Sequence, residues 1–585
     1  MEIDLVVRGP MKLTRVLLAL ILLGSTTVAQ KQAERPVCDR EQAFILIQEQ
    51  IAQSKTVDNT AARISILTQG ADLLWPYRQA AARATFAEAF EVATQDFRSS
   101  EKQQAHAGNL PDQRLVVIRA ISQRDSEWAR RLAKAIADEN EKDEEAGAPT
   151  DNRYQGETLL NIAATLLKND PKTAVTFARA SLRYPGSVAL ARFLFQLWIV
   201  DQRVSNQFYQ EALNAYANAP VNELLYLSAY AFGMNRVVGP EMQSTFFTVP
   251  PNFSSDAVAQ SAFMDVVLRR AQETTARTEQ PVSGPAAQPE IVQIYVALNG
   301  LRTLELAYAD RVISLLATIE PFLSAHARRE ASDISGWHQD LDLSLEKLGD
   351  RIENEKVPEK RERLIARAVL ASKSIEELER VESFVEKVSD LKFRGELLDW
   401  LYFKRVQKLV SDGRLDEAAQ LIPKVGRVDH RAFLAYLLAS ESTKKIKDSV
   451  LVIQVLEDVV KTALKAPNTS EKARTLLGLT SSYAKFDRSR AFEILGEAIN
   501  VIGKIDEPDL TSTAIFRRIG TDRFTIHAAY EMRSSTLETV FREFALDDFV
   551  KSLWLANQLP DKPLRATGTF AISGRCLEIS KKPPR

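Results

Sequence analysis

The chain has 585 residues, 76 Lys and Arg against 77 Asp and Glu, two cysteines and 45% hydrophobic side chains. A net charge this close to zero supplies no basic field, so binding to nucleic acid or to an anionic membrane surface is not expected. The length and the hydrophobic content suffice for more than one ordinary domain, or for one extended array.

The first 29 residues have the three parts of a secretory signal peptide. Two basic residues precede an unbroken apolar run over residues 16–23, and Ala29 provides a small residue for cleavage. The run is shorter than the about 20 residues that span a bilayer. We expect cleavage of residues 1–29, translation from Met11, and secretion to a bacterial periplasm without stable membrane insertion. The alternative is an uncleaved anchor.

The rest of the chain has the pattern of amphipathic helices. From Asp39 onward, Ala, Leu, Arg, Glu and Gln dominate, apolar residues recur at spacings of three and four, and strand-like alternation is almost absent. The predicted fold class is all-α.

One short pattern recurs in three of these segments. "RDSEWARRLAKAI", "NDPKTAVTFARASL" and "FDRSRAFEILGEAI" each place an Asp four residues before an Ala, with a large apolar residue three positions further on. The pairs are Asp125 with Ala129, Asp170 with Ala174, and Asp487 with Ala491. The Asp is predicted to cap a helix N-terminus, and the Ala lets a neighbouring helix approach closely. Chance matches are the alternative in so helical a chain.

The turns between helices recur at a nearly constant interval. Asp390, Asp429, Asn468 and Asp506 lie 39, 39 and 38 residues apart, and "LPD" occurs at residues 110–112 and again at 559–561. Asp112 and Asp151 are also 39 apart. A period in this range predicts a repeat of two helices that bury their apolar faces against neighbouring repeats. The predicted architecture is therefore an α-solenoid of stacked helical hairpins.

Some of these helices resemble the tetratricopeptide repeat family. Four residues have the spacing of that family's second helix, namely Thr173, Phe177, Ala180 and Pro185. In "GRLDEAAQLI" (413–422), a glycine followed by Glu-Ala is similar to the start of a helix in that family. Thr173 replaces the usual alanine, and Pro423 cuts the second match short. The resemblance covers about three units and implies a concave surface that binds a protein or peptide.

A change in composition divides the array into two blocks. Residues 271–290, "AQETTARTEQPVSGPAAQPE", are poor in large apolar residues and rich in Thr, Gln, Ala and Pro, which is typical of a linker. The predicted domains are an N-terminal helical repeat block over residues 39–270 and a C-terminal one over residues 291–576.

The two cysteines, Cys38 and Cys576, lie at opposite ends of the mature chain. A disulfide requires their Cα atoms to lie within about 7 Å of each other. In an open stack the ends separate by tens of ångströms, because each helix layer adds about 8–10 Å. A bridge therefore implies a closed or doubled-back array, whereas free thiols fit an open one.

The sequence has no catalytic, cofactor-binding or metal-binding motif. Its five histidines include no helical zinc pair, and it has neither a glycine-rich phosphate loop nor a nucleophile elbow. His338, Asp342 and Glu346 follow a four-residue step, but a charged helix face explains them without a metal ion. We expect neither enzyme activity nor a cofactor.

An aromatic stretch is the most distinctive part of the chain. Its first part has aromatic residues at the helical spacing of a buried core. Further on, Phe246 and Phe247 lie between prolines in "GPEMQSTFFTVPPNF", which ends at Phe253. These three residues either fill the core of the array or form an exposed patch for a partner, and we take them as the partner-binding candidates.

These observations predict a secreted, non-catalytic helical-repeat scaffold that binds a protein or peptide partner in the cell envelope. The prediction is an analogy from architecture. The alternative is a carbohydrate-active or cell-wall enzyme on a helical scaffold. Two clustered carboxylates of shifted acidity, next to Tyr or Trp platforms, would favour the enzyme.

Overall fold

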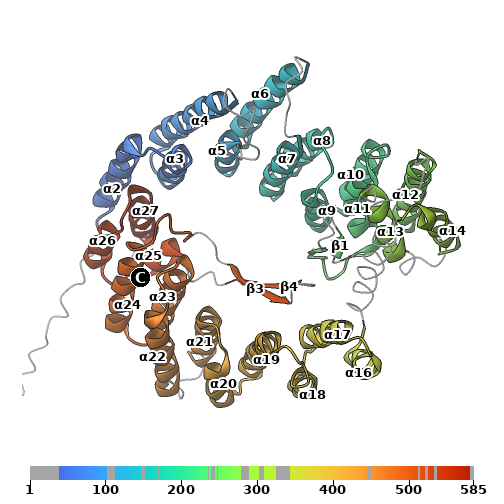
Figure 1. Ribbon diagram of the computed structural model, residues 1–585. Coiled ribbons are helices and arrows are strands. Elements are labelled where there is room, and N and C mark those ends of the chain that lie inside the picture. The colour runs from blue at the N-terminus through green and yellow to red at the C-terminus, as the bar shows by residue number, and fades with distance from the viewer. Residues whose placement is uncertain are drawn as a thin grey trace, which may run out of the picture.

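The computed structural model describes residues 38–101, 112–145, 152–168, 170–234, 236–238, 244–246, 248–277, 289–301, 309–323, 343–443, 449–510, 514–520, 525–531 and 536–579. Its helices form a ring with an inner and an outer layer, and the first and last described helices lie side by side (Figure 1). The all-α solenoid of stacked helical hairpins is thus confirmed, and it is closed on itself.

The inner and outer helices alternate along the described chain, except that α14 (Ala309–Ile319) and α16 (Leu345–Asn354) both lie in the outer layer. The inner helices are α3 (Thr60–Leu74), α5 (Gln113–Ser122), α7 (Asn152–Leu166), α9 (Val188–Val200), α11 (Val221–Phe232), α13 (Pro289–Leu301), α17 (Pro358–Ala371), α19 (Leu391–Ser411), α21 (Val428–Ser442), α23 (Ser470–Tyr483), α25 (Leu537–Phe544) and α27 (Lys562–Ile579). Each contacts the next from α3 to α13 and from α17 to α27, and α27 contacts α3. The inner wall therefore continues across the two ends of the chain.

The outer layer is formed by the helices in between. They are α2 (Arg40–Gln53), α4 (Gln79–Glu101), α6 (Ser126–Glu145), α8 (Pro171–Ser181), α10 (Gln202–Ala215), α12 (Ala257–Arg277), α14 (Ala309–Ile319), α16 (Leu345–Asn354), α18 (Ile375–Val385), α20 (Leu415–Leu421), α22 (Ser449–Lys465), α24 (Arg488–Ile502) and α26 (Phe549–Asn557). Short 3₁₀ turns follow three helices, at η1 (Ser54–Thr56), η3 (Glu320–Phe322) and η4 (Ile422–Lys424). No described helix is long and apolar enough to cross a membrane.

The three recurring Asp residues begin outer helices, as predicted. The side chain of each Asp accepts a hydrogen bond from the backbone amide three residues later. The distances are 2.9 Å for Asp125, 3.1 Å for Asp170 and 3.0 Å for Asp487. These bonds satisfy amides that have no partner within the helix. The alanines four residues later have no exposed surface, which allows the close packing that the pattern indicates.

The turn period corresponds to one inner–outer pair of helices. Asp390 caps α19, Asp429 lies in the first turn of α21, and Asn468 lies just before Thr469, which caps α23. Asp506 differs, because it follows α24 and precedes an insertion rather than an inner helix. These three inner helices begin 37 and 42 residues apart, so each predicted turn lies at the start of an inner helix but the helix starts follow the 39-residue interval only approximately.

Two β-hairpins interrupt the helical order, although strand-like alternation is almost absent from the sequence. β1 (Arg236–Val238) pairs with β2 (Ser244–Phe246) between α11 and α12. β3 (Ala514–Gly520) pairs with β4 (Thr525–Glu531) between α24 and α25. Each hairpin follows one helix of the repeat and precedes the next, so the repeat continues after it.

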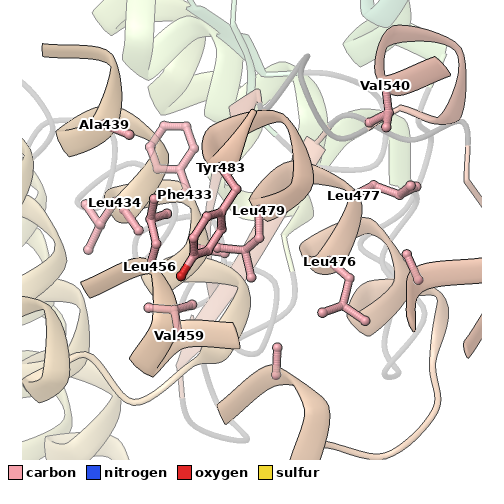
Figure 2. Close-up of a cluster of buried hydrophobic side chains, with 14 of the residues drawn as sticks. Phe433, Leu434, Ala439, Leu456, Val459, Leu476, Leu477, Leu479, Tyr483 and Val540 are labelled. Carbon is pink, nitrogen blue, oxygen red and sulfur yellow. The ribbon is translucent and has the colours of Figure 1, made fainter. Parts of the chain in front are cut away.

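The buried side chains form two cores that meet at α3. The first core runs from Ile64 to Leu323, and the second runs from Leu348 to Leu577 and also takes in the first helix, α2, through Ala43 and other residues. Figure 2 shows part of the second core, where apolar side chains of α21, α22 and α23 interlock. Ile51 packs against both cores. The packing therefore joins them through the N-terminal helices.

The predicted linker differs from the division that the packing shows. Residues 271–277 are the last turns of α12, and residues 278–288 lie outside the described part. α13 and α14 belong to the first core, and α2 belongs to the second. The cores therefore divide after Leu323, beyond the predicted linker. Composition identified a segment poor in large apolar residues at the end of α12, although Ala271, Thr274 and Thr275 are buried there, and it could not show which core the next helices join.

Lysine side chains of two inner helices bind the C-terminal carbonyl oxygens of a helix in the preceding pair. Lys404 Nζ donates to the carbonyl oxygens of Val369, Leu370 and Ser372 at 2.9, 2.6 and 2.7 Å, at the C-terminus of α17. Lys472 Nζ makes the same kind of contact at the end of α22. A cation is favourable there because the last carbonyls of a helix lack partners within it. Burial lowers the pKa of Lys404 to about 8.

Candidate functional site: the closing joint and the inner side of the ring

The ring closes through a helix pair built from both ends of the chain. α2 packs against α27, and α3 packs against both of them. α2 thus takes the outer position beside the inner helix α27. Its apolar face buries Ala43, Phe44 and Ile47 in the second core. The N-terminal helix therefore completes the last pair of the C-terminal block.

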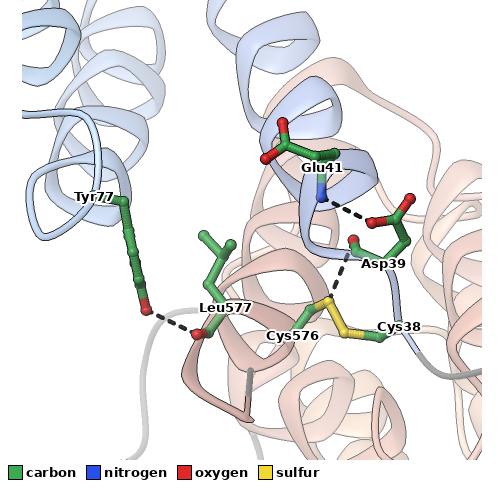
Figure 3. The surroundings of a disulfide bond; sticks show 6 residues. All are labelled: Cys38, Asp39, Glu41, Tyr77, Cys576 and Leu577. Atoms are coloured by element: carbon green, nitrogen blue, oxygen red, sulfur yellow. Dashed lines mark hydrogen bonds between the residues drawn. A yellow bond between two sulfur atoms is a disulfide. The ribbon is translucent and has the colours of Figure 1, made fainter. Parts of the chain in front are cut away.

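A disulfide between Cys38 and Cys576 links the two ends (Figure 3). Their Cα atoms lie 5.7 Å apart although they are 538 residues apart in sequence. The sequence allowed two alternatives, a closed array with a disulfide or an open array with free thiols. The structure has the disulfide and the closed array. Cys576 is buried in the core, and Cys38 lies at its edge.

Polar contacts hold the same joint. The Tyr77 hydroxyl donates to the carbonyl of Leu577 at 2.9 Å (Figure 3). Lys562 Nζ donates to the carbonyl and the hydroxyl of Thr56 at 2.9 and 2.8 Å. Each bond joins residues about 500 positions apart, so closure does not depend on the disulfide alone.

Two glycines permit the close approach of α3 and α27. A Cβ atom on Gly70 of α3 would lie 2.6 Å from Ile51 Cγ1 and 3.3 Å from Phe570 Cζ. A Cβ atom on Gly574 of α27 would lie 2.8 Å from Leu73 Cδ2. These distances are shorter than van der Waals contact, so the spacing of the two helices depends on the missing side chains.

Both β-hairpins lie on the inner side of the ring in Figure 1. β1 contacts the inner helix α11, and β3 contacts the inner helix α19. The hairpins thus approach the ring interior from the walls of different cores. The only two strand pairs among the described residues are therefore both placed where the ring surrounds them.

Of the three partner-binding candidates, only Phe253 has a side chain that the structure describes. Phe246 is the last residue of β2 and pairs with Arg236, and Phe247 lies outside the described residues. Phe253 is half-buried, and its ring centroid lies 5.1–5.2 Å from those of Phe195, Trp198 and Tyr230. Of the two alternatives, Phe253 therefore packs in the core, because its ring completes an aromatic cluster.

The aromatic residues that precede this segment also lie in the core, as their helical spacing predicts. Phe193 and Phe208 pack edge to face at 5.7 Å, and Tyr209 stacks on Tyr230 at 5.2 Å. Burial raises the pKa of Tyr230 to about 12. These rings stabilise α9, α10 and α11 and are not available as a binding platform.

A buried histidine lies between two inner helices of the second core. His430 of α21 has no exposed surface, and its Nδ1 lies 3.7 Å from Oδ2 of Asp399 on α19. Rings of Trp400 and Phe403 flank it at 6.0 and 4.9 Å. Burial lowers the pKa of His430 to about 4, so the imidazole is neutral at pH 7. No surface of this histidine can reach a substrate.

Next to it, two carboxylates have acidities shifted in opposite directions. Burial favours a higher pKa for Asp429, but hydrogen bonds from Arg427 outweigh it and lower this pKa. Burial and the Asp429 charge raise the pKa of Glu471, which also pairs with Arg427 at 2.9 Å. Such a pair is what acid–base chemistry needs. Trp400, which packs against His430, is 1% exposed and offers no platform for a sugar.

A serine and a lysine also meet between α21 and the end of α23. Lys485 Nζ donates to Ser440 Oγ at 3.1 Å, and Ser440 donates its own proton to the carbonyl of Tyr436 at 2.8 Å. Burial lowers the pKa of Lys485. A nucleophile activated by a lysine base must donate its proton to that lysine. Here the hydroxyl proton points to a carbonyl, so the contact is structural.

The described residues contain no group of three or more His, Cys, Asp or Glu side chains placed to hold a metal ion. Of the earlier metal candidate, His338 and Asp342 lie outside the described residues, and Glu346 lies in the first turn of α16. One groove of about 720 Å³ lies between the outer helices α12 and α14, with Leu268, Leu315 and Phe322 among its lining residues.

Comparisons with known proteins supply no family. No protein-family model matches the chain, and no curated protein matches it. Among solved structures, one similar chain is a "Circular tandem repeat protein with novel repeat topology and enhanced subunit contact surfaces", with 15% identity over 92% of this chain and 98% of that one. Its TM-score is 0.14, which does not indicate a superimposable fold. The ring therefore rests on the contacts described above.

Sequence reasoning missed both the composite closing pair and the inward hairpins. Only four residues, "TDRF", separate "AIFRRIG" from "TIHAAYE", and this spacing could have indicated a hairpin. Gly70 and Gly574 are isolated glycines within helical segments, which often mark a close helix contact. No local feature of the sequence shows that these two glycines lie at the same helix contact, because about 500 residues separate them.

Proposed function

We propose that this protein is a secreted, non-catalytic scaffold of the bacterial cell envelope that binds a protein or peptide partner on the inner side of its ring. The structure itself shows the helical repeat and its closure into a ring. Secretion is supported by the signal-like residues 1–29 and by a disulfide, which persists in oxidising compartments.

One observation carries the binding role: both β-hairpins in the described part of the chain lie on the inner side of the ring (Figure 1). Insertions that served only to connect helices could lie on either layer. Hairpins add backbone donors and acceptors to a concave wall, and concave walls are the binding surfaces of solenoid proteins. A closed frame also holds that wall in one shape, which lowers the ordering cost of binding.

The tetratricopeptide resemblance is part of this proposal. Phe177 is buried, and Ala180 packs against the same core in α8. Gly413 has a φ of 76° directly after α19, the left-handed conformation that a glycine at a helix end adopts. These residues support a helical hairpin of that general type.

The alternative function, an enzyme on a helical scaffold, rests on the Asp429–Glu471 pair. Glu471 is about half exposed, and Asp429 beneath it is 8% exposed as a side chain. Replacing Glu471 with Gln removes the shifted acid. Hydrolysis of cell-wall fragments by the unmodified protein, lost in Glu471→Gln, would establish the enzyme instead of the scaffold.

A site-specific crosslinking experiment tests the scaffold. A photo-reactive residue is placed at Phe246, in the inner hairpin, or at Val550, which is 60% exposed on the outer helix α26. The mature chain, residues 30–585, is irradiated in a cell-envelope extract of its source, and adducts are identified by mass spectrometry. We expect one dominant protein adduct at position 246 and none of that protein at position 550.

Equal capture at both positions, or capture at position 550 only, would contradict binding on the inner side. Thermal unfolding of both labelled proteins controls for damage to the fold. Adducts of wall fragments or sugars without protein would favour the enzyme.

A further inference from the structure

The disulfide at the closing joint connects two cysteines in different surroundings. Cys38 lies directly before Asp39, which caps the N-terminus of α2, and Cys576 lies in the last turn of α27 (Figure 3). Cys576 is 1% exposed, whereas Cys38 is only partly buried, at the edge of the second core. A reagent that exchanges thiols and disulfides therefore meets two sulfur atoms with unequal access.

The helix α2 contributes to the burial of Cys576. The Sγ atom of Cys576 lies 3.6 Å from the backbone oxygen of Asp39, at the start of that helix. α2 packs against α27 and buries Ala43 and Phe44 in the core that also contains Cys576. Thiol–disulfide exchange requires the attacking sulfur to reach the attacked sulfur directly, so access decides which cysteine reacts. With α2 in place, a reagent can approach Cys38 from the edge of the core, whereas Cys576 is covered.

Closure of the ring also brings the two cysteines together without the disulfide. They are 538 residues apart in sequence, so they rarely meet in an unfolded chain. The Tyr77 hydroxyl bond to Leu577 and the Lys562 bond to Thr56 join the ends of the chain without any sulfur atom. These contacts and the α2 packing place the Cα atoms of the cysteines 5.7 Å apart, within the range of a bridge. In a closed ring, one cysteine can then attack the other without an encounter in solution.

We propose that Cys38 is the site at which a disulfide-bearing oxidant reacts with the closed, reduced ring, and that Cys576 is the resolving cysteine. The inference rests on the closed ring and on the cysteine pair, and it does not depend on what the inner side of the ring binds. The oxidant is a protein oxidoreductase with a Cys-x-x-Cys pair or a small disulfide such as oxidised glutathione.

The reaction has two steps, each a transfer between sulfur atoms. The Cys38 thiolate attacks one sulfur of the oxidant and forms a mixed disulfide, while the other sulfur of the oxidant leaves as a thiolate. The Cys576 thiol then gives up its proton and attacks the Sγ atom of Cys38, and the remaining sulfur of the oxidant leaves. Two thiols of the protein are oxidised to the disulfide, and the oxidant is reduced to two thiols, which take up the two protons through water.

Two single-cysteine variants of the mature chain, residues 30–585, test which sulfur reacts. Cys576→Ser keeps Cys38, and Cys38→Ser keeps Cys576. Each folded variant is mixed with oxidised glutathione, and the mixed disulfide is followed by mass spectrometry. We expect Cys38 to react at least tenfold faster than Cys576, and the two rates to lie within threefold of each other in concentrated guanidinium chloride. Equal rates in the folded variants, or a faster reaction of Cys576, would overturn the proposal.

The reduced, unmodified protein gives a second measurement that does not depend on the folding of either variant. A limiting amount of iodoacetamide is added, and the alkylated peptides are counted by mass spectrometry. Cys38 should carry at least ten times as much label as Cys576. Equal labelling of the two cysteines would contradict the protection of Cys576.

A matched pair of substitutions tests the part that α2 plays. Phe44→Ala weakens the packing of α2, and Phe433→Ala removes a similar side chain of α21 from the same core. In the Cys38→Ser background, Phe44→Ala should accelerate the reaction of Cys576 at least tenfold, and Phe433→Ala less than threefold. Equal acceleration by both changes, or none by Phe44→Ala, would show that α2 does not protect this sulfur.

A cell-envelope extract of the source distinguishes the two kinds of oxidant. The reduced Cys576→Ser chain is added to the extract, free thiols are blocked, and the adducts are identified without reductant. A disulfide between Cys38 and a protein with a Cys-x-x-Cys pair identifies an oxidoreductase, and an adduct of glutathione or another small thiol identifies a small disulfide. No adduct at Cys38, or an equal yield at Cys576 in the Cys38→Ser chain, would overturn the assignment.

Discussion

The joint that closes the ring and the joint between α19 and α21 each hold neighbouring inner helices together, but they do so through different contacts. At the closing joint, helices from opposite ends of the chain meet through two glycines, a disulfide and hydrogen bonds from Tyr77 and Lys562. Between α19 and α21, large aromatic rings surround the buried His430.

The difference follows from chain connectivity. Neighbouring helices within a block are held close by short turns, so their packing needs little beyond apolar contact. The ends of the chain are joined only through the whole array, and they must be brought together against the entropy of a very long loop. Covalent and polar contacts at the closing joint offset that cost. We therefore expect the closing joint to be sensitive to redox conditions and the α19–α21 joint to acid.

The largest effect is expected when both the covalent and the apolar parts of closure are removed. Cys38→Ser and Cys576→Ser remove the bridge, and Phe44→Ala removes a side chain that is 3% exposed between α2 and its neighbours. A buried Phe→Ala change costs about 3–5 kcal/mol. We expect the triple variant to open the ring, measured as a larger radius of gyration in small-angle X-ray scattering.

The control for that variant is Phe433→Ala, in the same cysteine-free background. Phe433 is 6% exposed and stacks on Phe403 within the second core. It is expected to lower the melting temperature by a similar amount without opening the ring. An equal expansion in both variants would show that α2 has no special part in closure.

A smaller effect is expected from the disulfide alone. Removing a native disulfide costs about 2–4 kcal/mol, chiefly by freeing the unfolded chain. Cys38→Ser with Cys576→Ser should therefore lower the melting temperature while the radius of gyration stays the same, because the Tyr77 and Lys562 bonds and the α2 packing remain. Expansion of the ring in this double variant would mean that the disulfide itself is the closure.

The sequence predicts the local elements of this molecule well. Asp125, Asp170 and Asp487 begin helices as expected, since a cap depends on residues within one turn. The 39-residue interval marks successive inner helices at Asp390 and Asp429 for the same reason. Turn chemistry and helical periodicity are local, so a single sequence carries them.

The features of the candidate site are long-range, and a single sequence carries less of them. The sequence reduced the ring to two alternatives through Cys38 and Cys576, but it could not choose between them. It assigned α2 to the N-terminal block, whereas α2 packs in the second core. Phe253 was open to a surface role until its contacts with Trp198 and Tyr230 were known. Which distant helices meet depends on the sum of small rotations along the array.

The acid sensitivity of the α19–α21 joint follows from His430. Above pH 6.5 this histidine is neutral in both states; below it, the unfolded chain takes up a proton that the folded state, with a pKa of about 4, does not. Stability therefore falls as the pH drops from 6.5 to 4, by up to about 3 kcal/mol. Glu471, whose pKa is raised, titrates at the acid end of this range with the opposite sign, because its protonation favours the folded state.

Unfolding by urea at pH 7, 6, 5 and 4 measures this slope. In His430→Gln the part of the slope between pH 6.5 and 5 should disappear, even if the variant is less stable at every pH. An unchanged slope would show that His430 does not cause the acid sensitivity of this joint.

The smallest expected effects come from glycines, and they test how tightly the closing joint is packed. Gly70→Leu forces a side chain between Ile51 and Phe570, and overpacking of this kind costs about 1–3 kcal/mol. Gly496 of α24 is the matched control, because a Cβ atom there meets nothing within 4 Å. Gly496→Ala should stabilise the protein by about 0.5–1 kcal/mol, since alanine restricts the unfolded chain and favours helix.

Gly574→Ala should fall between these two variants. Its Cβ atom meets only the end of the Leu73 side chain, which can move, whereas the Cβ of Gly70 meets Ile51 closer to its backbone. Melting temperatures should therefore rank Gly496→Ala highest, then Gly574→Ala, then Gly70→Leu. If Gly70→Leu were as stable as the unmodified protein, α3 and α27 would have to lie further apart at the joint. Closure would then depend on the disulfide and the α2 contacts rather than on the fit of the two inner helices.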